Sequence, residues 1–125
     1  MNNGLEVNKR IYAILSSDEA LTAMIGSNCF PIIAEENATF PLVTFSRDSM
    51  YPEYSKDFNT GDIAEVSIQA VGNNYIQTVD ILSRIRTLLE NRQDDYFRRS
   101  TVIGATEAYI DNVYVQTLMF RFLIR

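Results

Sequence analysis

Residues 73–92, NNYIQTVDILSRIRTLLENR, determine how the rest of the chain is interpreted. Apolar residues recur there at steps of three and four with polar residues between them, which predicts an amphipathic helix. The apolar positions are Tyr75, Ile76, Val79, Leu82, Ile85, Leu88 and Leu89. Gly72 and the two asparagines after it would break the chain and cap the helix, and Asp80 could pair with Arg84 four residues later. Such a helix needs an apolar surface to pack against.

The segments on either side of this helix have the pattern of β-strands. Residues 61–71 and 101–125 alternate with a period of two and are rich in β-branched and aromatic residues. Residues 113–125 form a strand with no properly polar face. This last strand is either central and covered on both sides or covered by another subunit, and the second arrangement is favoured because few helices are predicted.

The N-terminal third predicts two short helices. Residues 5–15 have apolar positions close to helical spacing. Ser16 followed by Glu19 three residues later fits a capping box, which would start a second helix. Gly26 would end that helix, because a residue without Cβ can enter the left-handed conformation.

The other predicted elements complete a single layer of sheet. They are an edge strand or extended lead-in at 29–34, where Pro31 lacks an amide donor, a strand at 42–49 and a polar turn at 91–100. An irregular strand at 101–110 with a bulge at Gly104 and a hairpin turn at Asp111 and Asn112 follow. We therefore predict one α+β domain over residues 1–125. Its mixed or mainly antiparallel sheet has about five strands, with one long and one or two short helices packed on one face.

Residues 47–61, which we call the arm, fit neither period and combine aromatic with charged side chains. Three aromatics are too many for an idle linker, yet the proline and charges among them exclude a core segment. We expect the arm to project from the domain. The predicted interface residues are Arg47, Tyr51, Tyr54 and Phe58 in the arm and Val115, Met119 and Arg121 in the last strand.

Composition narrows the class of protein. With 125 residues, 46% of them hydrophobic and 22% charged, the chain is long enough to bury a core as one globular domain. No apolar run approaches the roughly 20 residues that cross a bilayer, and the N-terminus lacks a signal-peptide pattern, so we expect a cytoplasmic protein without a membrane partner. The net charge of −5 argues against binding nucleic acid through its phosphates.

The sequence contains little that could perform chemistry. Histidine is absent, which removes the usual general base and the commonest metal ligand. The acidic pairs at 35–36 and 94–95 could serve catalysis or bind a metal, but solvated surface positions are favoured. Cys29, the one cysteine, is either a packed small side chain, which is favoured, or a reactive thiol. We predict no catalytic, metal-binding or cofactor-binding residue and no enzyme activity.

The order of several short segments resembles the tail completion proteins of long-tailed bacteriophages and prophages, also called tail terminators or head-tail joining proteins. The segments are IYAIL at 11–15, SDEALTAMIG at 17–26, FP at 30–31, FPLVTF at 40–45, VSIQA at 66–70 before the helix with Tyr75, and FRF at 120–122. They cover most of the chain, with no clear match at residues 94–100.

This resemblance implies an α+β fold and a non-enzymatic role in virion assembly. Members of the best-known branches form hexameric rings that cap the tail tube at its head-proximal end and meet the head-tail connector. The implied partners are copies of the same chain, a tail tube protein and a connector protein, and the implied locations are the bacterial cytoplasm during assembly and the virion tail. An alternative is a small-ligand-binding or regulatory module that dimerises through its sheet, which a closed apolar pocket between sheet and helix would favour.

Overall fold

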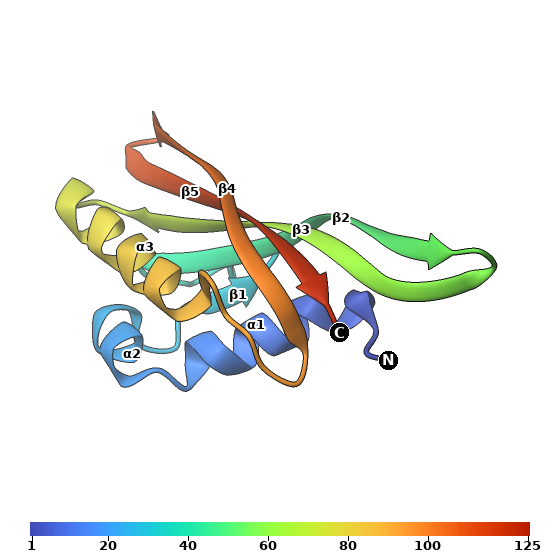
Figure 1. Cartoon of the computed structure of the whole chain (residues 1–125). Coiled ribbons are helices and arrows are strands. Elements are labelled where there is room, and N and C mark those ends of the chain that lie inside the picture. The colour runs from blue at the N-terminus through green and yellow to red at the C-terminus, as the bar shows by residue number, and fades with distance from the viewer.

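A computed structural model describes residues 1–125 and contains one five-stranded sheet with its helices on one face (Figure 1). The elements are η1 (Gly4–Glu6), α1 (Val7–Ser16), α2 (Glu19–Ile25), β1 (Cys29–Pro31), β2 (Leu42–Ser55), β3 (Phe58–Gly72), α3 (Tyr75–Leu89), β4 (Phe97–Ile110) and β5 (Val113–Ile124). The strand order is β1-β2-β3-β5-β4. Only β1 runs parallel to its neighbour, and all other pairs are antiparallel. The predicted α+β class and mixed sheet are confirmed.

The long helix α3 lies across β3 and β5, as the amphipathic pattern predicted. Asn74 caps it by accepting a hydrogen bond from the amide of Gln77 at 3.0 Å. The buried face consists of Thr78, Ile81, Leu82, Ile85 and Leu89. Tyr75 and Ile76 are 40% and 65% exposed, so the predicted apolar stripe is wrong in the first turn of the helix.

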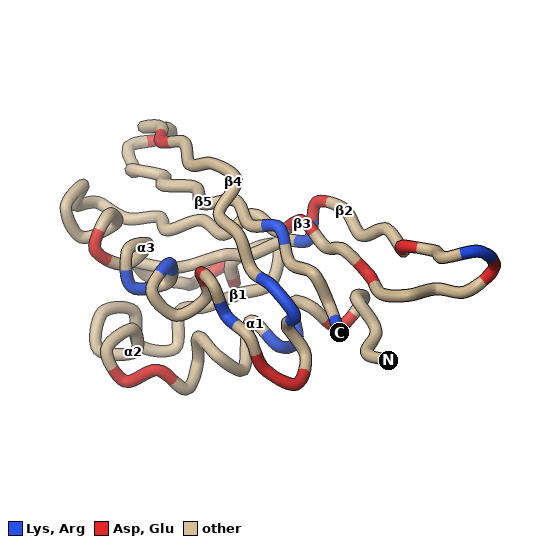
Figure 2. Tube along the Cα trace, in the orientation of Figure 1, with Lys and Arg blue, Asp and Glu red and all other residues tan.

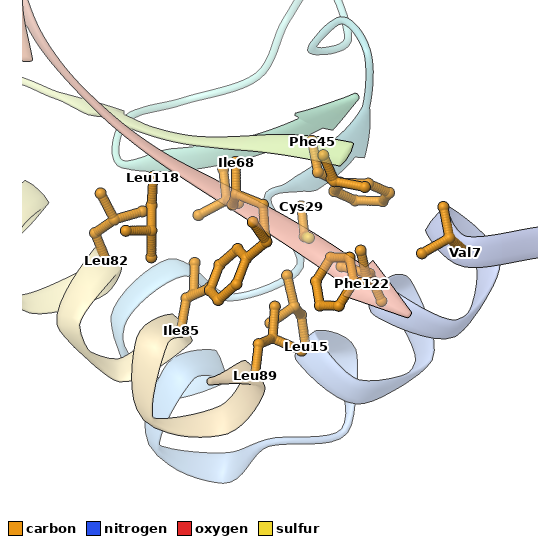
Figure 3. Close-up of a cluster of buried hydrophobic side chains, with 14 of the residues drawn as sticks. Val7, Leu15, Cys29, Phe45, Ile68, Leu82, Ile85, Leu89, Leu118 and Phe122 are labelled. Carbon is orange, nitrogen blue, oxygen red and sulfur yellow. The ribbon is translucent and has the colours of Figure 1, made fainter. Parts of the chain in front are cut away.

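The core fills the space between the sheet and the three helices (Figure 3). Every second residue of β3 from Ala64 to Ala70 is fully buried, and β5 contributes the alternate positions from Leu118 to Ile124. Val7, Ile11 and Leu15 cover one end of this layer from α1. Since consecutive side chains of a strand point to opposite faces, the opposite face of the sheet has no helix over it.

Asp18 replaces the predicted partner in two contacts, the cap of α2 and the ion pair of Arg84. The helix is capped by Asp18 rather than Ser16, because its carboxylate accepts the amide of Leu21 at 2.9 Å. The same carboxylate binds Arg84 through two hydrogen bonds of 2.9 and 2.7 Å. Arg84 therefore joins α3 to α2 instead of pairing with Asp80 on its own helix. Gly26 ends α2 with a φ of 62°, as predicted.

Strands β2, β3 and β4 are longer than predicted. The segment 91–100 is a turn only up to residue 96, because Asp94 Oδ1 accepts the amides of Tyr96 and Phe97 at 2.8 and 2.7 Å and reverses the chain within three residues. Strand β4 then begins at Phe97. The bulge at Gly104 is confirmed by the register shift between Val102 and Gly104.

The predicted turn at Asp111 and Asn112 is also confirmed. Both residues have positive φ, 53° and 67°. This is the conformation that a two-residue hairpin loop between twisted strands requires, and Asp and Asn accept it better than most residues.

Ile32 directly after β1 has a backbone conformation that a β-branched residue rarely adopts. Its φ is 66°, and the amide of Ile33 donates to the carbonyl of Pro31 across it at 2.7 Å. The side chain is 74% exposed, so little packing opposes a change. We expect Ile32→Gly to raise the free energy of unfolding by about 1 kcal/mol, because glycine adopts positive φ without strain. Urea denaturation checks this, and an unchanged or lower value would show that the turn is not strained.

Candidate interaction surfaces

The arm, predicted as an irregular loop, is the far end of the β2–β3 hairpin (Figure 1). Strand β1 pairs only with residues 43–45 of β2, and β5 pairs with β3 only from Asp62 onward. Beyond these positions the two strands pair with each other alone, and Lys56 and Asp57 form the turn between them. A two-stranded ribbon has no core of its own, so the sheet supports the arm at its base and solvent surrounds the rest.

Aromatic side chains cover both faces of this ribbon. Tyr51, Tyr54 and Phe58 are 42%, 65% and 75% exposed. The register pairs Tyr51 with Ile63, Tyr54 with Asn59 and Phe58 with Ser55, with a shift between Glu53 and Tyr54 at which Thr60 has no partner. Tyr54 therefore faces one side of the ribbon, and Tyr51 and Phe58 face the other. The role of the three residues as an interface stays a prediction.

Most charges of the arm already have partners within the chain. The Arg47 guanidinium donates to the carbonyl of Leu5 at 3.0 Å, which ties the base of the arm to the N-terminal segment. Glu53 lies 3.9 Å from Arg98 of β4. Lys56 and Asp57 at the tip make neither an ion pair nor a side-chain hydrogen bond, and both are exposed. Figure 2 shows adjoining basic and acidic positions at the tip of the β2–β3 hairpin.

The uncovered face of the sheet contains the other predicted interface residues. Val115 and Met119 are half-buried among their neighbours, and Arg121 is exposed and hydrogen-bonds Glu65 at 3.1 and 3.2 Å. Gln69 bridges Thr44 and Thr117 on the same face, with contacts of 3.5 and 3.4 Å. This face is therefore more polar than the last strand alone indicated, because β3 contributes polar side chains between the apolar ones. The register places Tyr51 one row along this face from Arg121, because Tyr51 pairs with Ile63 and Arg121 pairs with Glu65. Tyr54 and Phe58 lie beyond the last residue of β3 that pairs with β5.

A surface groove that was not predicted lies where α1 meets β1. This α1–β1 groove has a volume of about 730 Å³. Its lining includes Asn8, Lys9, Tyr12, Phe30, Glu35 and Phe45. The rings of Tyr12 and Phe45 are 6.3 Å apart between centroids, and the carboxamide oxygen of Asn8 is buried without a hydrogen-bond donor. No local sequence signal marks the groove, because it forms between segments that are distant in the chain.

A second aromatic group at the other end of the sheet was also missed. The rings of Tyr75 and Tyr109 both pack on Tyr114, at centroid distances of 5.6 and 4.9 Å. The Tyr75 hydroxyl donates to Glu107 Oε2 at 2.7 Å. This contact lowers the pKa of the Glu107 carboxyl and raises the pKa of the Tyr75 hydroxyl. The aromatic rings of this group therefore pack on one another and share a hydrogen bond, whereas those of the arm are left without such partners.

The sequence matches the model of a known protein family over most of its length. The family model described as "Tail completion protein gp17" matches residues 9–125. The chain belongs to this family. The resemblance inferred from the sequence is thereby confirmed, and the match includes residues 94–100, where the short segments showed no clear correspondence.

The fold of this tail completion protein is similar to that of a chain in a solved structure. That chain, from a structure titled "Virion of native gene transfer agent (GTA) particle", is 12% identical to the tail completion protein and superposes with a TM-score of 0.79. The match covers 91% of this chain and 90% of that one. At this identity the match shows a common fold. No curated protein matches the chain.

Family membership gives the chain a structural role in phage tail assembly. The described residues contain no group of three or more acidic or cysteine side chains that could hold a metal ion. None of the helices is long and apolar enough to span a membrane. Burial raises the pKa of the Cys29 thiol to about 11, which agrees with the packed side chain that was favoured.

Proposed function

We propose that this tail completion protein is a tail terminator, which forms a ring at the head-proximal end of a phage tail and joins the tail to the head-tail connector. Its role is non-enzymatic, and the ring is a hexamer. The partners are further copies of the chain, a tail tube protein and a connector protein. The protein assembles in the bacterial cytoplasm and stays in the virion tail. Membership in the tail completion family supports this proposal.

The observation that carries the proposal is the projecting arm. Exposed aromatic side chains on a ribbon without its own core are costly for a protein that works alone, because they present apolar area to water. Proteins that assemble use such segments to reach neighbours. The uncovered sheet face around Val115, Met119 and Arg121 offers a second contact surface, for a neighbouring subunit or the tail tube.

The alternative of a ligand-binding dimer lacks the feature that would favour it. The space between sheet and helices is filled by a cluster of 22 buried residues. The α1–β1 groove opens at the surface beside the sheet rather than between sheet and α3. These observations favour the assembly role over a ligand-binding dimer.

The ring is tested by negative-stain electron microscopy of the purified protein at high concentration, with and without magnesium, together with its mass in solution. We expect rings of uniform diameter and a mass that rises with concentration toward six copies. Immunogold labelling of virions should then place the protein at the junction of head and tail. A compact dimer at every concentration, or label along the whole tail, would contradict the proposal.

A further inference from the structure

The arm and the α1–β1 groove are two different surfaces of one chain. The aromatic side chains of the arm are exposed, and the groove is empty. We propose that the tip of the arm of one subunit inserts into the α1–β1 groove of a second copy. This inference rests on the proposed ring and identifies the contact that builds it. Because the two surfaces differ, the contact is head-to-tail. Repeated contacts of this kind form a closed ring if the rotation from one subunit to the next adds up to a full turn.

The distribution of aromatics on the arm favours a groove over a flat partner. Tyr54 and Phe58 lie on opposite faces of the ribbon tip. A flat surface, such as the uncovered face of the sheet, would cover only one of them and leave the other in water. A groove encloses both faces, and its apolar walls then remove both rings from solvent.

The α1–β1 groove has suitable dimensions and lining for this tip. Clefts that enclose a ligand typically measure about 300–1,000 Å³, and this groove falls within that range with about 730 Å³. Tyr12 and Phe30 provide accessible aromatic surface in the groove, whereas Phe45 is only 2% exposed.

Each of the two surfaces has one acidic and one basic side chain that is free or only weakly paired. At the arm tip, Lys56 and Asp57 have no partner within the chain. At the groove, Glu35 has no ion-pair partner, and Lys9 has only a 3.9 Å contact to Glu6 between two exposed side chains. An inserted tip can therefore pair Lys56 with Glu35 and Asp57 with Lys9. Such complementary charges fix the orientation of an interface and exclude like-charged alternatives.

Charge reversal gives a test that separates contact from folding. We expect Lys56→Glu and Glu35→Lys each to weaken self-association roughly tenfold or more, because each places like charges together in the contact. An equal mixture of the two variants should associate like the wild type. In that mixture, the acidic arm of the first variant meets the basic groove of the second, and the unchanged arm of the second meets the unchanged groove of the first. Sedimentation equilibrium of each variant and of the mixture measures this.

Each other outcome of this experiment overturns the inference. If either variant alone associates as tightly as the wild type, or if the mixture stays dissociated, the arm does not occupy this groove. Rings that persist in the variants would leave the tail terminator role intact while excluding this contact. A wild-type protein that stays monomeric at all concentrations would reject both the contact and the self-assembled ring.

Truncation of the aromatics provides a second, stronger perturbation. The double variant Tyr54→Ala, Phe58→Ala should weaken association roughly thirtyfold or more, as expected when central aromatic anchors are removed. Tyr109→Ala is the matched control, because Tyr109 is 61% exposed but lies near the β4–β5 turn. Circular dichroism should show unchanged folding for both. Equal weakening by both variants would indicate a contact that is not specific to the arm, and no weakening by the double variant would exclude arm insertion.

Discussion

Replacing Phe122 with alanine is expected to lower the free energy of unfolding by about 4 kcal/mol, within the range for large-to-small changes at fully buried aromatics. Phe122 is fully buried on the helix-covered face of β5. Its ring lies 5.0 Å from that of Phe97 and 5.3 Å from that of Phe120, between centroids. Truncation would therefore remove apolar contacts and leave a cavity between β4, β5 and α1.

Urea denaturation followed by circular dichroism measures this loss. Since domains of this size have total stabilities of about 5–15 kcal/mol, the variant should unfold at a much lower urea concentration. Phe58→Ala is the matched control, because the same change at an exposed arm position should alter the free energy of unfolding by at most about 0.5 kcal/mol. Similar losses in the two variants would contradict the division between core and arm.

The periodic parts of the sequence were sufficient to predict the fold class. Strands β3 and β5 and helix α3 each bury one face in the same core. Apolar residues therefore recur at every second position in the strands and at every third or fourth position in the helix, and this spacing can be read from the sequence. The turn at Asp111 and Asn112 was predictable for a local reason, because positive φ is favourable for few residue types.

The wrong predictions combine local signals that were misjudged with distant contacts that no local pattern shows. Asp18 rather than Ser16 caps α2, although both residue types favour this position, and the same carboxylate binds Arg84 of α3. Residues 91–100 are polar in sequence, but the Asp94 carboxylate accepts amides two and three residues later, and this short turn lets Phe97 pack on Phe122. Only the contacts with Arg84 and Phe122 cannot be derived from neighbours in the chain.

The candidate surfaces were predictable only in part. Clustered aromatics without periodicity identified the arm, since exposed ribbons lack the alternation that burial imposes on a strand. That the arm continues the sheet as paired strands was not predicted, because charged and proline residues weaken the strand signal there. The α1–β1 groove combines residues from three separate segments, so only the folded chain reveals it.

The arm lies outside the core that stabilises the chain. Its aromatics lie outside the buried cluster, so they add nothing to the core and cost little if changed. The core in turn holds the base of the arm through β3, whose residues pair with β2 on one side and β5 on the other. Variants of the arm should therefore alter assembly without altering folding, whereas variants of the core should alter folding first.

The connection between α2 and α3 is expected to depend on pH through Asp18. Asp18→Ala should lower the free energy of unfolding at pH 7 by about 2 kcal/mol, because it removes both a helix cap and a bidentate ion pair. Asp18→Asn should cost about 1 kcal/mol, since asparagine caps a helix equally well but cannot pair with Arg84 as a charge. Asp80→Asn is the matched control and should have almost no effect, because Asp80 is exposed and Arg84 binds Asp18.

The hydrogen bonds from Arg84 hold the pKa of the Asp18 carboxyl below its usual value near 3.8. A carboxyl group whose pKa is lower in the folded than in the unfolded chain stabilises the fold above the unfolded pKa, and this stabilisation disappears as the pH falls through the folded pKa. The difference between wild type and Asp18→Asn should therefore be full at about pH 5–7 and shrink steadily below about pH 4. Urea denaturation at a series of pH values measures it, and a difference that stays constant down to about pH 2 would show that the Arg84 contact stabilises through packing rather than through charge.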